Sequence, residues 1–145
     1  MNARTFALIF GILYVAVGLS GFIPGITTPM EAGAPDLAVD AGYGRAFGLF
    51  PVNILHNIVH LAIGLWGLAS YRRFAAARAY ARGLAIFYGL LAVLGLIPLT
   101  NTTFGLIPIF GHDVWLHLVS ALIAAYFGWA AHDDEPMTST VGARR

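Results

Sequence analysis

Four long apolar segments, separated by stretches rich in proline, glycine and polar residues, set the pattern of this chain. They cover about residues 6–23, 52–70, 83–97 and 114–131. A helix needs roughly 20 apolar residues to cross about 30 Å of hydrocarbon, and the first segment has 18 residues without a charge. The pattern therefore predicts an all-α protein, an integral membrane four-helix bundle within residues 1–135, followed by a polar tail at 136–145.

The stretches between the segments predict turns and loops. Residues 27–44 carry acidic and turn-forming residues, which argue against regular structure there. The basic stretch 71–82 connects the second segment to the third. Asp113 stands just before the fourth segment and has a side chain suited to capping a helix N-terminus. These connections predict two antiparallel helical hairpins.

A polar stripe interrupts the second apolar segment. Asn53, His56, Asn57 and His60 are three or four residues apart, so a helix places them on one face. Such a face must point away from lipid. The fourth segment repeats the stripe with His117 and Ser120.

Two offsets indicate an internal repeat. An offset of 57 residues aligns GLFP at 48–51 with GLIP at 105–108 and places His60 on His117, whereas an offset of 74 places Tyr14 on Tyr88. Because both hairpins begin on the same side, the repeat is parallel, with its axis along the membrane normal. We expect a layer of two histidines and two tyrosines roughly 13 Å below the outer helix ends, at 1.5 Å per residue. Its polar members are Tyr14, Tyr88, Asn53, Asn57 and Ser120.

Composition supports a membrane protein and excludes several other classes. The 145 residues are 59% hydrophobic and only 10% charged. Without cysteine there are no disulfides and no thiolate sites. The net charge is +1 and the arginines gather between the apolar segments instead of forming a basic face, so we expect no nucleic-acid partner. The arginine distribution places both termini in the cytoplasm.

Several segments together resemble a known family. They are GLFPVNILHNIVHL, the basic connection, the tyrosine-bearing third segment that ends in LGLIP, and FGLIPIFGHDVWLHL. Over about residues 6–131 the chain resembles the bacterial membrane-protein family catalogued as domain of unknown function 4383. The resemblance implies a four-span, multi-pass protein of the bacterial cytoplasmic membrane, and it implies no activity.

The histidines are the candidate ligands for a metal ion or a cofactor. His56 and His60 are one helical turn apart, as in a metal-binding pair, and His117 could approach as a third ligand. Alternatively, His60 and His117 supply imidazoles to opposite faces of a haem, with His56 as a further ligand. Among cofactors, haem ranks ahead of zinc or copper.

Two other functions remain open. The histidine and tyrosine layer is also consistent with a hydrogen-bonded clasp in a non-catalytic subunit of a larger membrane complex or a homo-oligomer. A third interpretation is a proton or small-solute relay, with His112 and Asp113 at the outer mouth as its entry. No serine has a credible histidine and aspartate partner, and no phosphate-binding motif is present, so the sequence predicts no enzyme.

Overall fold

The computed structural model describes residues 1–131 as a mostly helical chain. Its four helices are α1 (Ala3–Ser20), α2 (Ile54–Ser70), α3 (Phe74–Gly95) and α4 (His112–Ala125), and the π-helical turn η1 (Tyr126–Ala130) continues the last one. Three of them, α1, α3 and α4 together with η1, are long and apolar enough to cross a membrane. The fourth, α2, is apolar but has 17 residues. The predicted tail at 136–145 lies outside the described residues.

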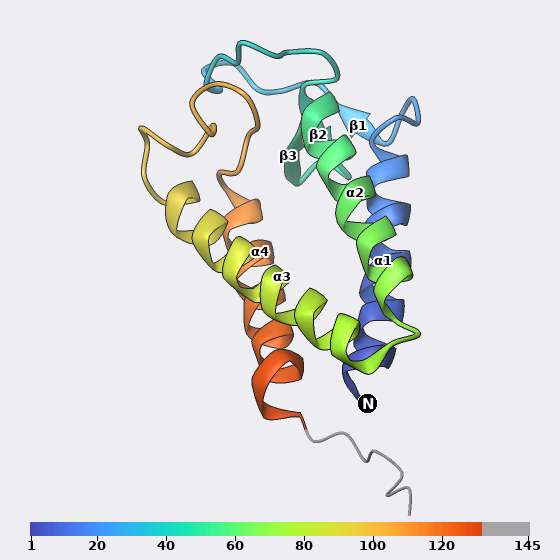
Figure 1. Cartoon of the computed structure of the whole chain (residues 1–145). Helices are drawn as coiled ribbons and strands as arrows, with labels where there is room; N and C mark the ends of the chain where they lie inside the picture. The colour runs from blue at the N-terminus through green and yellow to red at the C-terminus, as the bar shows by residue number, and fades with distance from the viewer. Residues whose placement is uncertain (132–145) are drawn as a thin grey trace, which may run out of the picture.

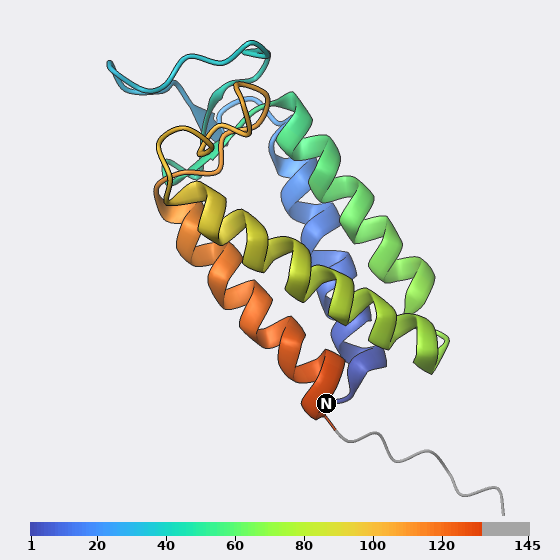
Figure 2. The same cartoon turned by 60° about the vertical axis from the view of Figure 1, so that its left-hand side comes forward.

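The helices form two pairs. Helix α1 packs along α2, and α3 packs along α4 (Figure 1). Figure 2 shows the same helices turned by 60°, with the N-terminus close to the end of η1. At that end the ring of Phe6 stacks on Phe127 at 5.0 Å between centroids and lies 6.1 Å from the ring of Tyr80. This buried aromatic cluster holds the two pairs together at one end.

Glycines allow α1 and α2 to approach closely. A Cβ atom at Gly64 would lie 2.6 Å from the backbone nitrogen of Val15 and 2.8 Å from the carbonyl oxygen of Gly11. These distances are shorter than any normal carbon contact, so only glycine fits. On α3 and α4 most of the buried small residues are instead alanines, and Gly95 packs against Ile109 and Val114; the alanines include Ala81, Ala85, Ala92, Ala121 and Ala124. Both interfaces therefore use small side chains, as membrane helices commonly do.

Helix α3 begins nine residues before the predicted segment at 83–97, so the interpretation of 71–82 as a connection is wrong for most of that stretch. Only Tyr71, Arg72 and Arg73 lie between α2 and α3. Alanine is the strongest helix former, and five alanines stand among residues 74–81. Arg82 is also part of this helix. Its side chain donates from Nε to the carbonyl oxygen of Gly128 at 2.8 Å, which gives the guanidinium a partner on η1.

The prediction of no regular structure in residues 27–44 is also wrong at both ends of that stretch. Three short antiparallel strands, β1 (Thr27–Thr28), β2 (Gly44–Ala46) and β3 (Phe50–Val52), form a sheet in the order β1-β2-β3. In the register, Thr27 pairs with Ala46 and Arg45 pairs with Pro51. Proline is tolerated in β3 because this strand is at the sheet edge. The sheet lies beside the starts of α2 and α4 and closes that end of the molecule (Figure 1).

Candidate metal centre

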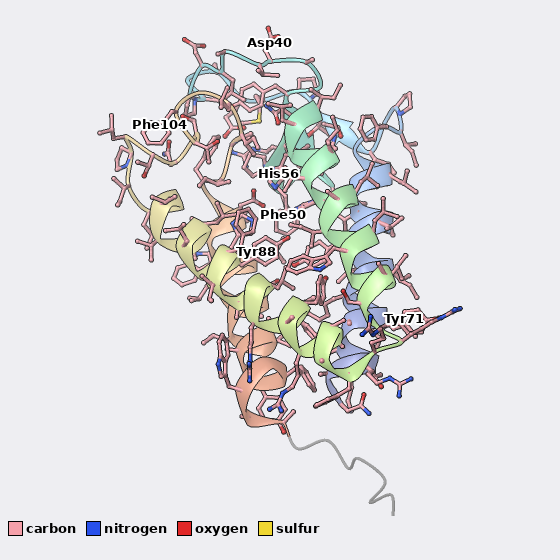
Figure 3. All side chains as sticks on the ribbon, in the orientation of Figure 1. Asp40, Phe50, His56, Tyr71, Tyr88 and Phe104 are labelled. Carbon is pink, nitrogen blue, oxygen red and sulfur yellow. The ribbon has the colours of Figure 1, made fainter. Side chains whose placement is uncertain are left out.

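Three buried histidines meet between the two helix pairs. His56 and His60 come from α2 and His117 from α4, and their exposed fractions are 3%, 4% and 2%. One ring nitrogen of each lies within 4.8 Å of the corresponding atoms of the other two. Figure 3 shows His56 in the region between the helix pairs, on the same side as Tyr88. The three histidines could hold a metal ion.

The start of α2 fixes the position of His56. The side chain of Asn53 caps this helix, because its Oδ1 accepts from the backbone N–H of His56 at 2.9 Å. His56 Nδ1 lies 3.1 Å from the carbonyl oxygen of Pro51. When Nδ1 carries the proton and donates it to this carbonyl, Nε2 keeps a free lone pair for a metal, which is the usual arrangement of a histidine ligand.

His60 and His117 keep a ring nitrogen available for a ligand. In each of them Nδ1 is buried and has no hydrogen-bond partner among residues 1–131. The hydroxyl of Tyr88 and Oδ2 of Asp113 are also buried and have no hydrogen-bond partner among residues 1–131. A buried polar atom without a partner costs about 1–3 kcal/mol, so such atoms gathered at one place are typical of a site that takes a ligand or an ion.

Tyrosines from both pairs lie beside the histidines. The ring of Tyr14 on α1 lies 5.6 Å from that of His60, and Tyr88 on α3 stacks on His117 at 4.9 Å with 22° between the ring planes. The two tyrosine rings are 5.5 Å apart. Each helix pair thus contributes one tyrosine and at least one histidine to a continuous cluster of rings.

The other predicted polar members lie in different surroundings. Asn53 is at the outer end of α2, where its Nδ2 donates to the carbonyl oxygens of Val39 and Leu106 at 2.8 and 2.7 Å. Asn57 is buried against Gly21, where a Cβ would overlap its side chain. Ser120 is buried near Tyr14 and His60. Asn53 therefore joins the loop between α1 and α2 to the loop between α3 and α4, and it does not belong to the ring cluster.

The prediction that Asp113 caps the fourth helix is wrong. Gly111 occupies the N-cap position, and α4 begins at His112. Asp113 is then in the first turn on the inward face that also carries His117, so it is 1% exposed. Its Oδ2 lies 3.7 Å from Nδ1 of His56. His112 is exposed and lines an outer hollow with Arg45 and Trp115, so the two predicted residues of the outer mouth lie in different environments.

Asp113 is the residue of this cluster that sequence reasoning misplaced. The signal that could have found it is the offset of 57 residues, which pairs His56 with Asp113 as well as His60 with His117. In the structure both pairs meet at the same place. A carboxylate next to a ligating imidazole orients the ring and raises its basicity.

Two small cavities flank the ring cluster. One, of about 170 Å³, lies between α1 and α4 and ends on His60 and Asp113. The other, of about 230 Å³, lies between α2 and α3 and is lined by all three histidines and Tyr88. Apart from a few polar side chains, both walls are apolar. The ring cluster therefore has a small cavity on two of its sides.

One family model matches the chain. It is described as "Domain of unknown function (DUF4383)" and covers residues 4–130. The resemblance predicted from the sequence is thereby confirmed. No curated protein and no solved structure matches the chain.

Proposed function

We propose that this chain, which belongs to the DUF4383 family, is a four-span protein of the bacterial cytoplasmic membrane that binds a transition-metal ion through His56, His60 and His117. The observation that carries the proposal is the approach of three buried imidazoles, with ligand nitrogens within 4.8 Å of one another. A helix that crosses lipid gains nothing from buried imidazoles unless they have partners, and intramembrane ionisable residues are mostly functional.

The donor set suits a borderline metal. Imidazole is a good ligand for zinc, copper, nickel and iron. Zn–N bonds of about 2.0–2.1 Å in a tetrahedral site bring the nitrogens to about 3.4 Å from one another. The three rings therefore need to move together by about an ångström or less, which rotamer adjustments in α2 and α4 can supply. Three protein ligands leave a fourth position free, as in catalytic metal sites.

The membrane arrangement follows from the same helices. Helix α2 has 17 residues, which is about 26 Å of helix at 1.5 Å per residue, and strand β3 leads directly into it. We take it as the fourth span, beside the three longer ones. In this arrangement the pairs α1–α2 and α3–α4 are the two parallel repeats, and the arginines at positions 4, 72, 73, 78 and 82 keep both termini in the cytoplasm.

Haem is the second candidate, with His60 and His117 as axial ligands. The space beside the histidines argues against haem. The cavities beside the histidines are about 170 and 230 Å³, smaller than the roughly 300–1,000 Å³ of typical small-molecule sites. The ring of His56 also lies 4.5 Å from that of His60, where a macrocycle would have to pass. These observations favour an ion over haem.

The remaining alternatives use the same residues without a cofactor. A packing clasp in an accessory subunit needs only hydrogen bonds among the rings, and a relay needs only titratable imidazoles. Neither makes use of three nitrogens that converge on one point. Both predict that the protein contains no stoichiometric metal.

Metal analysis of detergent-purified protein tests the proposal. We expect about one ion per chain in the wild type and, on titration with Co²⁺, visible d–d bands of a nitrogen-ligated ion. His56→Gln, His60→Gln and His117→Gln should each weaken binding by at least about 100-fold, equivalent to about 2.7 kcal/mol, whereas the exposed His112→Gln should not. Equal metal content in wild type and His60→Gln would overturn the proposal. A Soret band lost in His60→Gln and His117→Gln would establish haem instead.

A further inference from the structure

The cavity between α1 and α4 has an apolar entrance on the outside of the helix bundle. Its rim is formed by Leu13 and Val17 of α1, Leu116 of α4 and Phe47 beside the sheet. Of these, Leu13, Leu116 and Phe47 are exposed. In the proposed membrane arrangement this face of α1 and α4 meets lipid. A molecule dissolved in the bilayer can therefore reach the cavity sideways, without crossing water.

The inner end of this cavity is polar. Asp113, His60, Tyr14 and Ser120 form it. Oδ2 of Asp113 and Nδ1 of His60 are buried and have no hydrogen-bond partner among residues 1–131. Oδ2 is an acceptor whether the carboxyl group is charged or neutral. An apolar tunnel that ends on an unpaired acceptor is suited to a molecule with an apolar body and one hydrogen-bond donor.

Size and wall chemistry narrow the class of ligand. The volume of about 170 Å³ accommodates roughly one ring, well below the roughly 300 Å³ at which sites for larger ligands begin. Phe50, Phe47 and Tyr14 line it, and aromatic walls favour an aromatic guest through offset or edge contacts. Figure 3 shows Phe50 in the same central region as His56. The rest of a longer ligand would stay in the bilayer.

We propose that this cavity binds the hydroxylated aromatic ring of a lipid-soluble molecule, a phenol or hydroquinone with an apolar tail, whose hydroxyl donates to Oδ2 of Asp113. The tail leaves between Leu13 and Leu116 into the lipid. The site shares His60 and Asp113 with the surroundings of the proposed metal centre, but His56 and His117 do not line this cavity, so phenol binding does not require the ion. It gives the protein a ligand from the membrane in addition to an ion.

Photolabelling in phosphatidylcholine nanodiscs tests this site in metal-free protein kept in a chelator. The probe is an alkylphenol with a diazirine on the chain carbon next to the ring. Mass spectrometry should find the label on α1 and α4 at Leu13, Val17 or Leu116. Nonylphenol should compete at least about tenfold better than its methyl ether, because the ether cannot donate a hydrogen bond to Oδ2 of Asp113.

Two pairs of variants make the test specific. Asp113→Leu should bind the phenol no better than the ether while still binding both. Leu116→Trp should reduce labelling at least about tenfold by narrowing the entrance. Leu118→Trp should not, although Leu118 is on the same helix and equally exposed, at 37% against 38% for Leu116. His117→Gln should lose the metal yet keep phenol binding, so failure of either proposal is distinguishable.

Three results would overturn the phenol site. The first is competition by the ether equal to that by nonylphenol, which would mean an apolar cavity without a recognised hydroxyl. The second is label spread evenly over the exposed apolar face. The third is an equal effect of Leu116→Trp and Leu118→Trp.

Discussion

The two helical hairpins, α1–α2 and α3–α4, have the same order of elements but pack in different ways. In the first hairpin glycines bring the backbones into contact, with Gly11, Gly64 and Gly67 at the crossing. In the second hairpin most of the buried small residues are alanines, and glycines make such close contacts near its ends, at Gly95 and Gly128. Close backbone contact gains dispersion energy at every atom, but it leaves no room for adjustment. The first hairpin therefore has its close backbone contacts in the middle of its helices, and it holds two of the three histidines.

At the level of the ring cluster the hairpins differ in one pair of positions. The offset of 57 residues matches His60 with His117 and His56 with Asp113. The first match joins two histidines. The second matches a histidine with an aspartate, and Nδ1 of His56 lies 3.7 Å from Oδ2 of Asp113. Two identical hairpins would give four imidazoles. The difference gives three neutral donors and one buried acid, which can offset part of the charge of a divalent ion.

The outer loops differ most. The first loop carries Glu31, Asp36, Asp40 and Arg45 and contributes the sheet, whereas residues 96–111 of the second loop include no charged residue. Nδ2 of Asn53 donates to a carbonyl in each loop. The hairpins are thus joined by aromatic rings at the end with the N-terminus, and at the opposite end by the Asn53 amide and by the hydrogen bond from the Ala38 N–H to the carbonyl oxygen of Gly105 at 2.8 Å.

Substitution of Gly64, in the glycine contact between α1 and α2, should have the largest effect on stability. In Gly64→Leu the new side chain would meet the backbone of α1, so we expect the unfolding free energy in detergent to fall by about 3 kcal/mol, the upper part of the range for overpacking. Gly89→Leu is the control, because a Cβ there has no atom within 4 Å. Similar melting temperatures for both variants would contradict the importance of the glycine contact between α1 and α2.

Removal of the amide between the loops should have the next largest effect. Asn53→Ala loses the cap of α2, worth about 1 kcal/mol, and leaves the carbonyls of Val39 and Leu106 without their donor, at about 1 kcal/mol or more. We expect a loss of about 2–3 kcal/mol in equilibrium unfolding. Asn101→Ala in the second loop is the matched control and should change stability by less than about 0.5 kcal/mol.

Neutralisation of the single acid in the ring cluster should sharpen the difference between His56 and Asp113. Asp113→Asn keeps the shape of the side chain but removes the acidic group beside the imidazole of His56. Loss of such a partner typically reduces metal affinity by 10–100-fold, and we expect a change in that range by competition titration with a chelator. His112→Gln at the neighbouring position is the control. Unchanged affinity in Asp113→Asn would mean that the acid does not assist the ligand.

The two loops should differ in how their stability depends on pH, and this is the smallest of the four predicted effects. Arg45 donates from Nε to Glu31 at 2.7 Å, and its hydrogen bonds lower the pKa of Glu31 from 4.5 to about 2. Because the folded-state pKa is depressed, the stabilisation is present above pH 4.5 and is lost as the pH falls through about 2. Glu31 is exposed, so the gain is modest.

Hydrogen exchange can separate the two loops in that window. Protection of residues 27–46 should fall between pH 4.5 and 2 after correction for intrinsic exchange rates, and protection of residues 97–110 should stay constant. In Glu31→Gln the first loop should lose this dependence on pH. A parallel decrease in both loops would indicate general unfolding instead.

Much of the helical part was predictable from local pattern. The apolar runs and their breaks at Pro24 and Pro98 gave the number of helices, and the three-and-four spacing of His56, Asn57 and His60 gave the buried face of α2. The start of α3 was missed because arginines were taken to mark a loop. In the structure, helix propensity and the bond from Arg82 to Gly128 keep them in the helix.

The sheet and the role of Asp113 were not predictable in this way. Each strand has two or three residues, too few for a periodic signal, and β1 pairs with a segment some seventeen residues away. Asp113 is polar, next to a glycine and at a helix start, so local rules make it a cap. Its burial depends on the rotation of α4 against α2, which no local rule contains.

The sequence by itself determined which segments are helical, which faces of the helices are polar and which family the chain belongs to, because each depends on residue spacing along one segment. Only the tertiary structure decided that His56, His60 and His117 meet, that Asp113 faces His56, and that an apolar cavity reaches them from the side. The physical reason is that burial and ligand geometry depend on how helices rotate and approach one another. Backbone contact at glycines and the long-range pairing of loops set that geometry in three dimensions.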